Sequence, residues 1–205
     1  MFDTKALQRR MAYDARNAQP NKEELSESIC ARLVGLSDYA DADTVMWYLH
    51  CRSEVRTRQA VSRALETSKR VVIPYCTKGI DGSNRLGLWL LEDLRELEPG
   101  LWGILEPPAA RRSESQKQVS ADELDLIVVP GVAFDKMGGR LGNGAGYYDR
   151  LLQEVRNDAV LAAVCFESQL LPAVAIEPHD VYMHYVITEK SVYRGEKQRL
   201  QVTGI

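Results

Sequence analysis

The chain contains few cysteines, and none of them stands in a metal-binding or redox pattern. The four are scattered, with no C-x-x-C pair and no histidine at ligand spacing; they are Cys30, Cys51, Cys76 and Cys165. A structural zinc site is therefore not expected. Cys165 lies in the apolar run VLAAVCF, where a small core residue is expected, and reduced thiols are the ordinary state of a cytoplasmic protein.

Long hydrophobic runs and an excess of positive charge are also missing. The longest apolar stretch, 124–134, is interrupted by an aspartate, a proline and a glycine, whereas a membrane span needs roughly eighteen apolar residues. The N-terminus is charged from its first residues and lacks an apolar core, so no signal peptide is expected. The net charge of −3 argues against a general nucleic-acid surface. We expect a soluble, cytoplasmic protein that binds neither nucleic acid nor membranes, as a monomer or, alternatively, as a dimer.

The length and the hydrophobic pattern predict a single α/β domain. With 205 residues, of which 45% are hydrophobic, the chain can bury one substantial core. Short apolar runs alternate with amphipathic segments, which is typical of parallel strands covered by helices on both faces. The predicted fold is a three-layer α/β/α domain with a mainly parallel sheet over 1–205. Helices are expected over 3–17, 22–36, 56–68 and 147–156, and strands over 44–49, 70–75, 86–91, 124–129, 160–166 and 181–188.

Three segments do not follow this alternation. The strand over 86–91 follows a turn-rich loop and is a candidate antiparallel strand. Residues 106–120 contain two prolines and many polar side chains, so we expect a mobile loop. A polar tail is expected from Glu189 onwards.

The first predicted helix carries four basic residues, Lys5, Arg9, Arg10 and Arg16. They can form a solvated face, which is the ordinary role of such residues. Alternatively, they converge on an anion. Lys5 and Arg9 are four positions apart and therefore lie on one side of a helix.

A polar turn, HCRSE, follows the predicted strand over 44–49. Ligands of open α/β sheets bind at the carboxyl ends of the strands, so this turn is a candidate wall of a site. The alternative is that Ser53 and Glu54 open the helix that follows, because acids are common near helix N-termini. Both interpretations stay open at this point.

The densest signal is the glycine-rich segment 128–149, VVPGVAFDKMGGRLGNGAGYYD. Glycine at Gly142, Gly144 and Gly146 lets successive N–H groups point into one concavity just before a helix N-terminus, and both features bind anions. Arg140 adds a planar, permanently charged donor that suits phosphate. The segment therefore predicts a phosphate cradle.

Two familiar nucleotide motifs describe this segment poorly. No Gly-Lys-Ser/Thr follows, so it is not a Walker A loop. The spacing G-x-G-x-G does not match the dinucleotide fingerprint, and the loop does not directly follow a strand. Glu167 keeps a dinucleotide interpretation open, because it ends the next predicted strand, where a ribose-binding acid is expected.

Asp149 lies in the first turn of the predicted helix, close to the expected anion. A carboxylate beside phosphate is repelled by it unless a cation lies between them, which predicts Mg²⁺ at this position. Otherwise Asp149 complements the helix dipole.

Several motifs in chain order resemble 5-formyltetrahydrofolate cyclo-ligases, also called 5,10-methenyltetrahydrofolate synthetases. The segment LIVVPGVAFDKMGGRLGNGAGYYDRLL resembles the signature of that family, and Lys5-x-x-x-Arg9 resembles its basic N-terminal motif. The further matches are YLHCRSEVRT, SKRVVIP, LWGILEPP and IEPHDV, which together span nearly the whole chain. The resemblance implies a fold of the type shared by sugar-phosphate isomerases and coenzyme A transferases.

The resemblance also implies a reaction and a set of site residues. The reaction converts 5-formyltetrahydrofolate, which can carry a polyglutamate tail, to 5,10-methenyltetrahydrofolate, with ATP as co-substrate and Mg²⁺ as cofactor. By the resemblance, Arg140 and Asp149 are catalytic. Magnesium is assigned to Asp149 and Asp180. The ATP-binding residues implied are Lys5, Arg9, Arg140, Leu141, Gly142, Asn143, Gly144, Ala145, Gly146, Tyr147 and Tyr148. The folate-binding residues implied are Leu49, Glu54, Trp102, Asn143, Gly144, Ala145, Gly146 and Tyr147.

The chain departs from some family members at two loop positions, where Asn143 and Ala145 replace basic side chains or glycine. Phosphate binding then depends more on Lys5, Arg9 and Arg140. Two other functions stay open: a non-catalytic relative that binds folate or nucleotide, and a dinucleotide-binding oxidoreductase.

Overall fold

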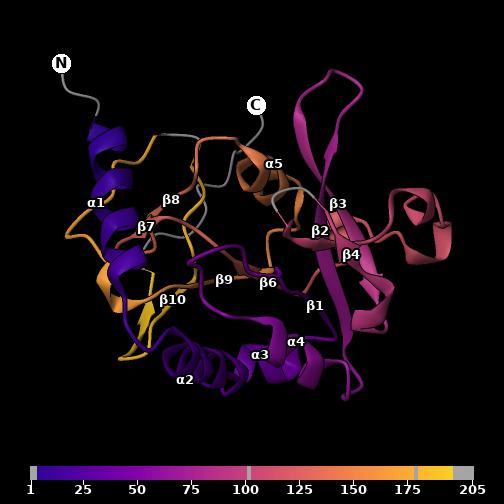
Figure 1. Ribbon diagram of the computed structural model, residues 1–205, viewed down its shortest axis with the longest axis horizontal. Helices are drawn as coiled ribbons and strands as arrows, with labels where there is room; N and C mark the ends of the chain where they lie inside the picture. Colours follow the sequence, from indigo (N-terminus) through magenta and orange to yellow (C-terminus); the bar gives the residue numbers. More distant parts are fainter. Residues whose placement is uncertain (1–3, 101–102, 178–179, 196–205) are drawn as a thin grey trace.

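The computed structural model describes residues 4–100, 103–177 and 180–195, and its centre is a seven-stranded sheet (Figure 1). The strand order is β11-β10-β9-β6-β1-β2-β3. The strands are β1 (Thr44–Met46), β2 (Arg70–Lys78), β3 (Asn84–Leu91), β6 (Leu126–Val129), β9 (Val160–Val164), β10 (Tyr185–Ile187) and β11 (Val192–Arg194). All neighbours pair in parallel except at the two edges, where β2–β3 and β10–β11 are antiparallel.

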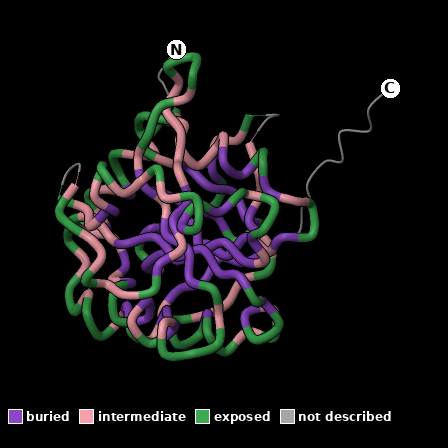
Figure 2. Tube along the Cα trace, turned by 90° about the vertical axis from the view of Figure 1, so that its right-hand side faces the viewer, coloured by how far each residue is buried: buried purple, intermediate pink, exposed green. Residues whose placement is uncertain are grey.

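Side chains alternate along the strands between two hydrophobic cores, as a strand period of two requires. On one face Val45, Leu126 and Ala162 pack against α2 (Lys22–Val34), α3 (Ser37–Asp41) and α4 (Arg58–Ala64). On the other face, the residues next to these in the chain pack against α5 (Tyr147–Glu154). The buried parts of the trace accordingly run through its middle and the exposed parts around its rim (Figure 2). The predicted three-layer α/β fold with a mainly parallel sheet is confirmed.

The first helix, α1 (Thr4–Ala18), stands apart from these layers at the side of the molecule (Figure 1). It packs against a two-stranded ribbon, β7 (Ala133–Phe134) and β8 (Arg140–Leu141), through Ala12, Val132 and Leu141. This ribbon lies within the glycine-rich segment. Because α1 packs on this ribbon, the residues that follow β8 lie close to the N-terminal helix.

The boundaries of several elements differ from the sequence prediction. The first strand ends at Met46 rather than at residue 49, because the Tyr48 carbonyl accepts from the Thr57 hydroxyl at 2.6 Å instead of joining the ladder. The last predicted strand begins at Tyr185 rather than 181, since the Met183 N–H donates to the Gly138 carbonyl. The polar tail predicted from Glu189 is wrong in its first part, which forms the edge strand β11.

The described residues of the segment 92–120 form little regular structure, but they make several contacts with the edge of the sheet. It contains the short pair β4 (Glu98–Pro99) and β5 (Leu105–Glu106) and the 3₁₀ turns η1 (Leu94–Glu96), η3 (Ala109–Arg111) and η4 (Ser115–Lys117). Lys117 is buried and forms ion pairs with Glu92 and Glu96, each at 2.8 Å. The mobility of 106–120 stays a prediction.

The remaining 3₁₀ turns are η5 (Ala121–Glu123) and η6 (Glu167–Gln169). None of the helices in the described part of the chain is long and apolar enough to cross a membrane.

The turn between β7 and β8 is built around a buried carboxylate. Asp135, which is 5% exposed, accepts from the N–H groups of Met137, Gly139 and Val174 at 2.8–3.0 Å. A Cβ at Gly139 would lie 2.5 Å from the Asp135 carboxylate, closer than atoms can approach. The glycine at this position is therefore required by the turn and not by a ligand.

Gly139→Ala is expected to lower the free energy of unfolding by about 2 kcal/mol, because it displaces a buried, three-fold hydrogen-bonded carboxylate. Urea unfolding monitored by circular dichroism measures this change. Gly35→Ala is the matched control, since a Cβ there meets its nearest neighbour, the Ala31 carbonyl oxygen, at 3.4 Å. Equal midpoints for the two variants would contradict the assignment.

Candidate functional site

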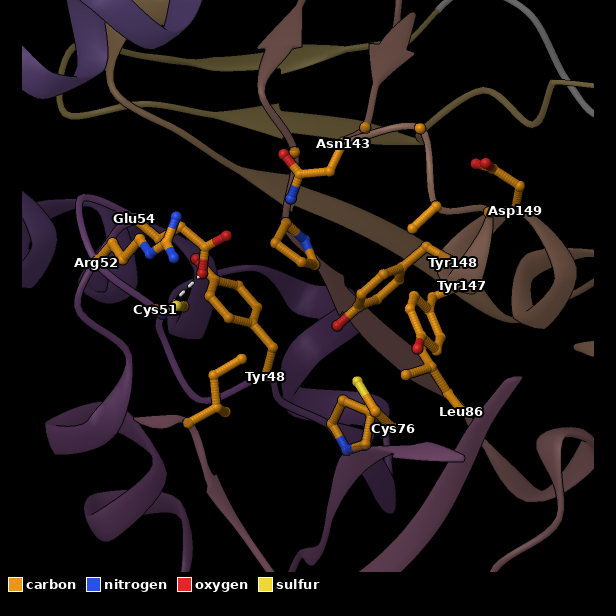
Figure 3. Close-up of a pocket in the computed structure, with 18 of the residues that line it drawn as sticks. Tyr48, Cys51, Arg52, Glu54, Cys76, Leu86, Asn143, Tyr147, Tyr148 and Asp149 are labelled. Atoms are coloured by element: carbon orange, nitrogen blue, oxygen red, sulfur yellow. Dashed lines mark hydrogen bonds between the residues drawn. The ribbon is translucent and has the colours of Figure 1, made fainter. Parts of the chain in front are cut away.

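A cavity of about 500 Å³ opens at the carboxyl ends of β1 and β6. These strands are neighbours in the sheet, but the chain leaves β1 through α4 towards β2 and leaves β6 through α5 towards β9. The two helices cover opposite faces, which makes this a topological switch point, the ordinary ligand site of open α/β sheets. Figure 3 shows Cys51 and Glu54 on one side, Tyr147 and Tyr148 on the other, and Asn143 and Asp149 above them.

The upper wall of the cavity is the glycine loop, residues 142–146, all of which line it. Gly144 and Gly146 have φ of 86° and 74°, a region that glycine adopts without strain, and Gly146 is the N-cap of α5. Among the described residues, no acceptor is found for the backbone N–H groups of residues 142–149. This run of open donors at a helix N-terminus fits an anion, as the sequence predicts.

Arg140 lies beneath the loop, with only 6% of its side chain exposed. Its guanidinium forms an ion pair with Asp149, donates to the Pro130 carbonyl at 3.5 Å and lies 5.9 Å from the Tyr148 ring. Its Nε is buried and has no hydrogen-bond partner within the described chain. The carboxylate that is expected to repel an anion is thus neutralised by the protein's own arginine.

The basic residues of α1 reach two different places. The Arg9 Nε donates to the Gly142 carbonyl at 2.9 Å, so its cation lies against the glycine loop. Lys5 forms ion pairs with Glu177 at 3.2 Å and Asp180 at 3.5 Å. Lys5, Arg9 and Asp180 do not belong to the cavity lining.

The predicted metal ligands are therefore engaged with different cations, Asp149 with Arg140 and Asp180 with Lys5. Within the described ranges, no cluster of three or more acidic, cysteine or histidine side chains could by itself hold a metal. The side chain of Asp149 is 42% exposed and lines the cavity, so it can accept one further ligand.

Arg16 is the main site residue that sequence reasoning missed. The solvated face proposed for it is wrong, because it is only 4% exposed and lines the cavity. Its Nε donates to the Ser53 hydroxyl at 3.1 Å, and its Nη1 donates to the Gly131 carbonyl at 3.3 Å and lies 3.9 Å from Glu54 Oε1. The helical spacing from Arg9 through Tyr13 to Arg16 could have revealed it.

Glu54 forms the opposite wall. It precedes α4, which begins at Arg58, so it does not serve as the first turn of that helix. Its Oε2 accepts from the Cys51 N–H at 2.9 Å, which aims the carboxylate into the cavity (Figure 3). Burial, the largest influence, raises the pKa of Glu54, although the Cys51 N–H and Arg16 oppose it.

The floor combines apolar groups with hydroxyl and carboxylate groups. Leu49, for which a folate-binding role stays a prediction, is buried and lines the cavity. Burial raises the pKa of Tyr148 far above its ordinary range, so its hydroxyl stays protonated. Glu106, a second residue missed in the sequence, is 3% exposed and accepts from the Cys76 N–H at 3.3 Å and from Arg112 at 3.1 Å. Its position directly before Pro107–Pro108 at a strand end was the available signal. Trp102 lies outside the described residues.

Glu167 does not act as a ribose-binding acid. One carboxylate oxygen accepts from the Thr188 hydroxyl at 2.6 Å and the other from the Tyr193 hydroxyl at 2.8 Å. These bonds hold the turn η6 to the end of β10 and to β11, and Glu167 does not line the cavity. The feature that supported a dinucleotide-binding oxidoreductase is therefore structural.

The fold and the site define an α/β enzyme whose cavity joins an anion cradle to a wall carrying a buried carboxylate. The model of the 5-formyltetrahydrofolate cyclo-ligase family matches residues 3–189. The chain therefore belongs to that family, and it is an enzyme of that cyclo-ligase class.

Individual relatives agree with this membership. A Schizosaccharomyces pombe protein named "Probable 5-formyltetrahydrofolate cyclo-ligase" is 34% identical over 83% of this chain and 86% of its own. A 5-formyltetrahydrofolate cyclo-ligase of Mycolicibacterium smegmatis is 33% identical over 72% of this chain and 74% of its own. The solution structure of Aquifex aeolicus 5,10-methenyltetrahydrofolate synthetase superimposes with a TM-score of 0.78, at 28% identity, over 95% of this chain and 94% of that one.

Proposed function

We propose that this enzyme converts 5-formyltetrahydrofolate to 5,10-methenyltetrahydrofolate, with ATP and Mg²⁺, and releases ADP and phosphate. The observation that carries the proposal is one cavity with an unsatisfied N–H cradle on one wall and the Glu54 carboxylate on the other. An anionic nucleotide suits the first wall. A pterin, which presents several N–H donors on one edge, suits the second.

The proposed chemistry explains why a phosphoryl donor is needed. The N5-formyl group is an amide, and its oxygen is a poor leaving group. The formyl oxygen attacks the γ-phosphate of ATP, which breaks the bond to ADP and gives an iminium phosphate. The N10 amine then adds to the iminium carbon and loses its proton, and phosphate leaves as the ring closes. Catalysis of this kind depends on positioning and on neutralising charge.

The residues of this chain would supply both the positioning and the neutralising charge. The open N–H groups of residues 142–149 and the Arg140 guanidinium would bind the phosphates, and Arg9 would add positive charge behind the loop. Glu54 would accept from the pterin donors and fix the formyl group's orientation. Tyr147 and Tyr148 also line the cavity, and the Tyr148 hydroxyl, which points into it (Figure 3), would donate to a bound substrate.

A magnesium ion fits this site as a partner of ATP. Mg²⁺ commonly uses one or two protein carboxylates and takes its other ligands from phosphates and water. The half-exposed Asp149 carboxylate would hold it at the cavity edge, and Asp180 would join only after leaving Lys5. Bound there, Mg²⁺ would neutralise developing phosphate charge.

Mixing the protein with 5-formyltetrahydrofolate, Mg²⁺ and ATP is expected to produce the near-ultraviolet absorbance of the methenyl product, with one ADP formed per product. Replacing ATP by a non-hydrolysable analogue should abolish the signal, because the formyl oxygen would have no phosphoryl group to accept. A well-folded protein that binds both substrates and forms no product would instead be the non-catalytic relative. Product formed without ATP would contradict the proposed chemistry.

A further inference from the structure

One face of α1 touches both walls of the cavity. The residues Lys5, Arg9, Tyr13 and Arg16 follow one another at spacings of four, four and three, which places them in one stripe along the helix. Arg9 donates to the Gly142 carbonyl and Tyr13 donates to the Asn143 side chain, both in the glycine loop. Arg16, one turn further, reaches the opposite wall at Glu54.

The Arg16 guanidinium joins its own helix, α1, to two segments that are distant in the sequence. It binds the turn after β1 through Ser53 and Glu54, and the end of β6 through the Gly131 carbonyl. A buried arginine needs such partners, because an unpaired buried charge is strongly destabilising. Its donors lie in one plane, and Nη1 faces the Glu54 carboxylate, which the Cys51 N–H orients, at 3.9 Å.

Tyr13 links the same helix to the loop. Its hydroxyl donates to Asn143 Oδ1, and its ring lies 5.0 Å from the Arg16 guanidinium. Contacts therefore run without a break from Asn143 in the loop, through Tyr13, to the guanidinium that faces Glu54.

We propose that Tyr13 and Arg16 are positioning residues that couple the two walls, so that nucleotide in the glycine loop tightens the binding of folate at Glu54. The inference depends on the proposed function, because it assigns ATP to one wall and the folate to the other. Binding of either substrate orders α1 for the second. Coupling between binding sites is reciprocal, so folate must tighten nucleotide binding by the same factor.

The coupling is measured by titrating 5-formyltetrahydrofolate with and without a saturating non-hydrolysable ATP analogue, and then in the reverse order. In the unmodified protein each ligand is expected to lower the Kd of the other by about five-fold or more. In Tyr13→Phe the factor should fall towards one. This variant keeps the ring on Arg16 and removes only the hydroxyl, so the folate Kd without nucleotide should stay within about two-fold.

Arg16→Gln tests the other end of the link and should raise the KM for folate by about ten-fold; because the coupling is reciprocal, the KM for ATP at saturating folate should rise by the coupling factor that is lost, about five-fold. Arg16→Lys keeps the charge and should recover part of this loss. Arg10→Gln, an exposed arginine of the same helix, is the matched control. Thermal unfolding of each variant separates positioning from loss of the fold.

Two results have different meanings. If the unmodified protein binds the ATP analogue but the coupling factor is one, or if Tyr13→Phe keeps the full factor, the coupling role is overturned while the proposed function stands. If the protein binds no nucleotide at all, the proposed function fails and the coupling fails with it.

Discussion

Arg140→Met is expected to lower kcat/KM for ATP by about 10³-fold, the largest loss for any single side chain of the site. Charge-stabilising donors in phosphoryl and acyl transfer contribute effects of this order. The setting of Arg140 is the basis for this expectation: its side chain is 6% exposed, and its Nε has no partner among the described residues. Methionine keeps an unbranched, apolar stem that can stay buried, and it removes every donor.

The fold should survive this change. Breaking a buried ion pair is costly when the remaining charge stays buried. Here the remaining partner, Asp149, is 42% exposed and can be solvated, so the midpoint of thermal unfolding should change little. Arg58→Met, an exposed arginine on α4, is the control and should keep full activity. A kcat/KM for ATP within three-fold of the unmodified enzyme would remove Arg140 from the mechanism.

Asp149→Asn then separates two roles of this carboxylate. The ion pair with Arg140 predicts that Asp149 orients the guanidinium, and the proposed function adds a contact with Mg²⁺. If orientation is the whole role, the double variant with Arg140→Met is no worse than Arg140→Met alone, because the two act as one unit. If Asp149 also holds the metal, activity of Asp149→Asn should recover partly as Mg²⁺ is raised. Full activity at ordinary Mg²⁺ would contradict both roles.

The sequence predicted those parts of the fold and site that depend on local pattern. Apolar runs and amphipathic segments identified the strands and helices because their periods differ, and the glycine spacing identified the anion cradle. The pattern also led to the correct layers, since strands such as 126–129 are apolar on both faces. These features are encoded within a few neighbouring residues.

What the sequence did not reveal depends on contacts between distant segments. The charge of Arg16 is ordinary for a surface helix, and only its ties to Ser53, Glu54 and Gly131 make it a buried residue. The edge strand β11 is short and half polar, so its pairing with β10 left no hydrophobic signal. The glycines of the segment also have different roles, which their spacing cannot show. Gly139 packs on Asp135, whereas Gly144 lines the cavity.

Glu54→Gln is expected to lower kcat/KM for 5-formyltetrahydrofolate by about 10²-fold while kcat/KM for ATP at saturating folate changes less. A hydrogen bond to a charged group contributes about 1.5–3 kcal/mol, and glutamine offers a donor where the pterin also offers donors. The control is Glu66→Gln, an exposed glutamate near the end of α4. A folate KM unchanged by Glu54→Gln would show that the pterin edge binds elsewhere.

The same substitution should show a distinct pH dependence. The ionisable groups that act on Glu54 come from several elements and are Arg16, Tyr48, Cys51, Arg56 and Tyr148. Burial outweighs the cations and raises the pKa of Glu54 above its ordinary value of 4.5. The acid limb of kcat/KM for folate should therefore lie above that value in the unmodified enzyme and disappear in Glu54→Gln.

Stability should move in the opposite direction from activity. Because the pKa of Glu54 is raised in the folded protein, its protonated form stabilises the fold below pH 4.5, and that contribution is lost as the pH rises through the folded-state pKa. At pH 7 the folded protein therefore holds an unfavourable charge that Glu54→Gln removes. The variant should unfold at a higher temperature than the unmodified protein at pH 7, and the difference should close below pH 4.5. A lower melting temperature at pH 7 would mean that the favourable contacts with Arg16 and the Cys51 N–H outweigh the cost of burying this carboxylate.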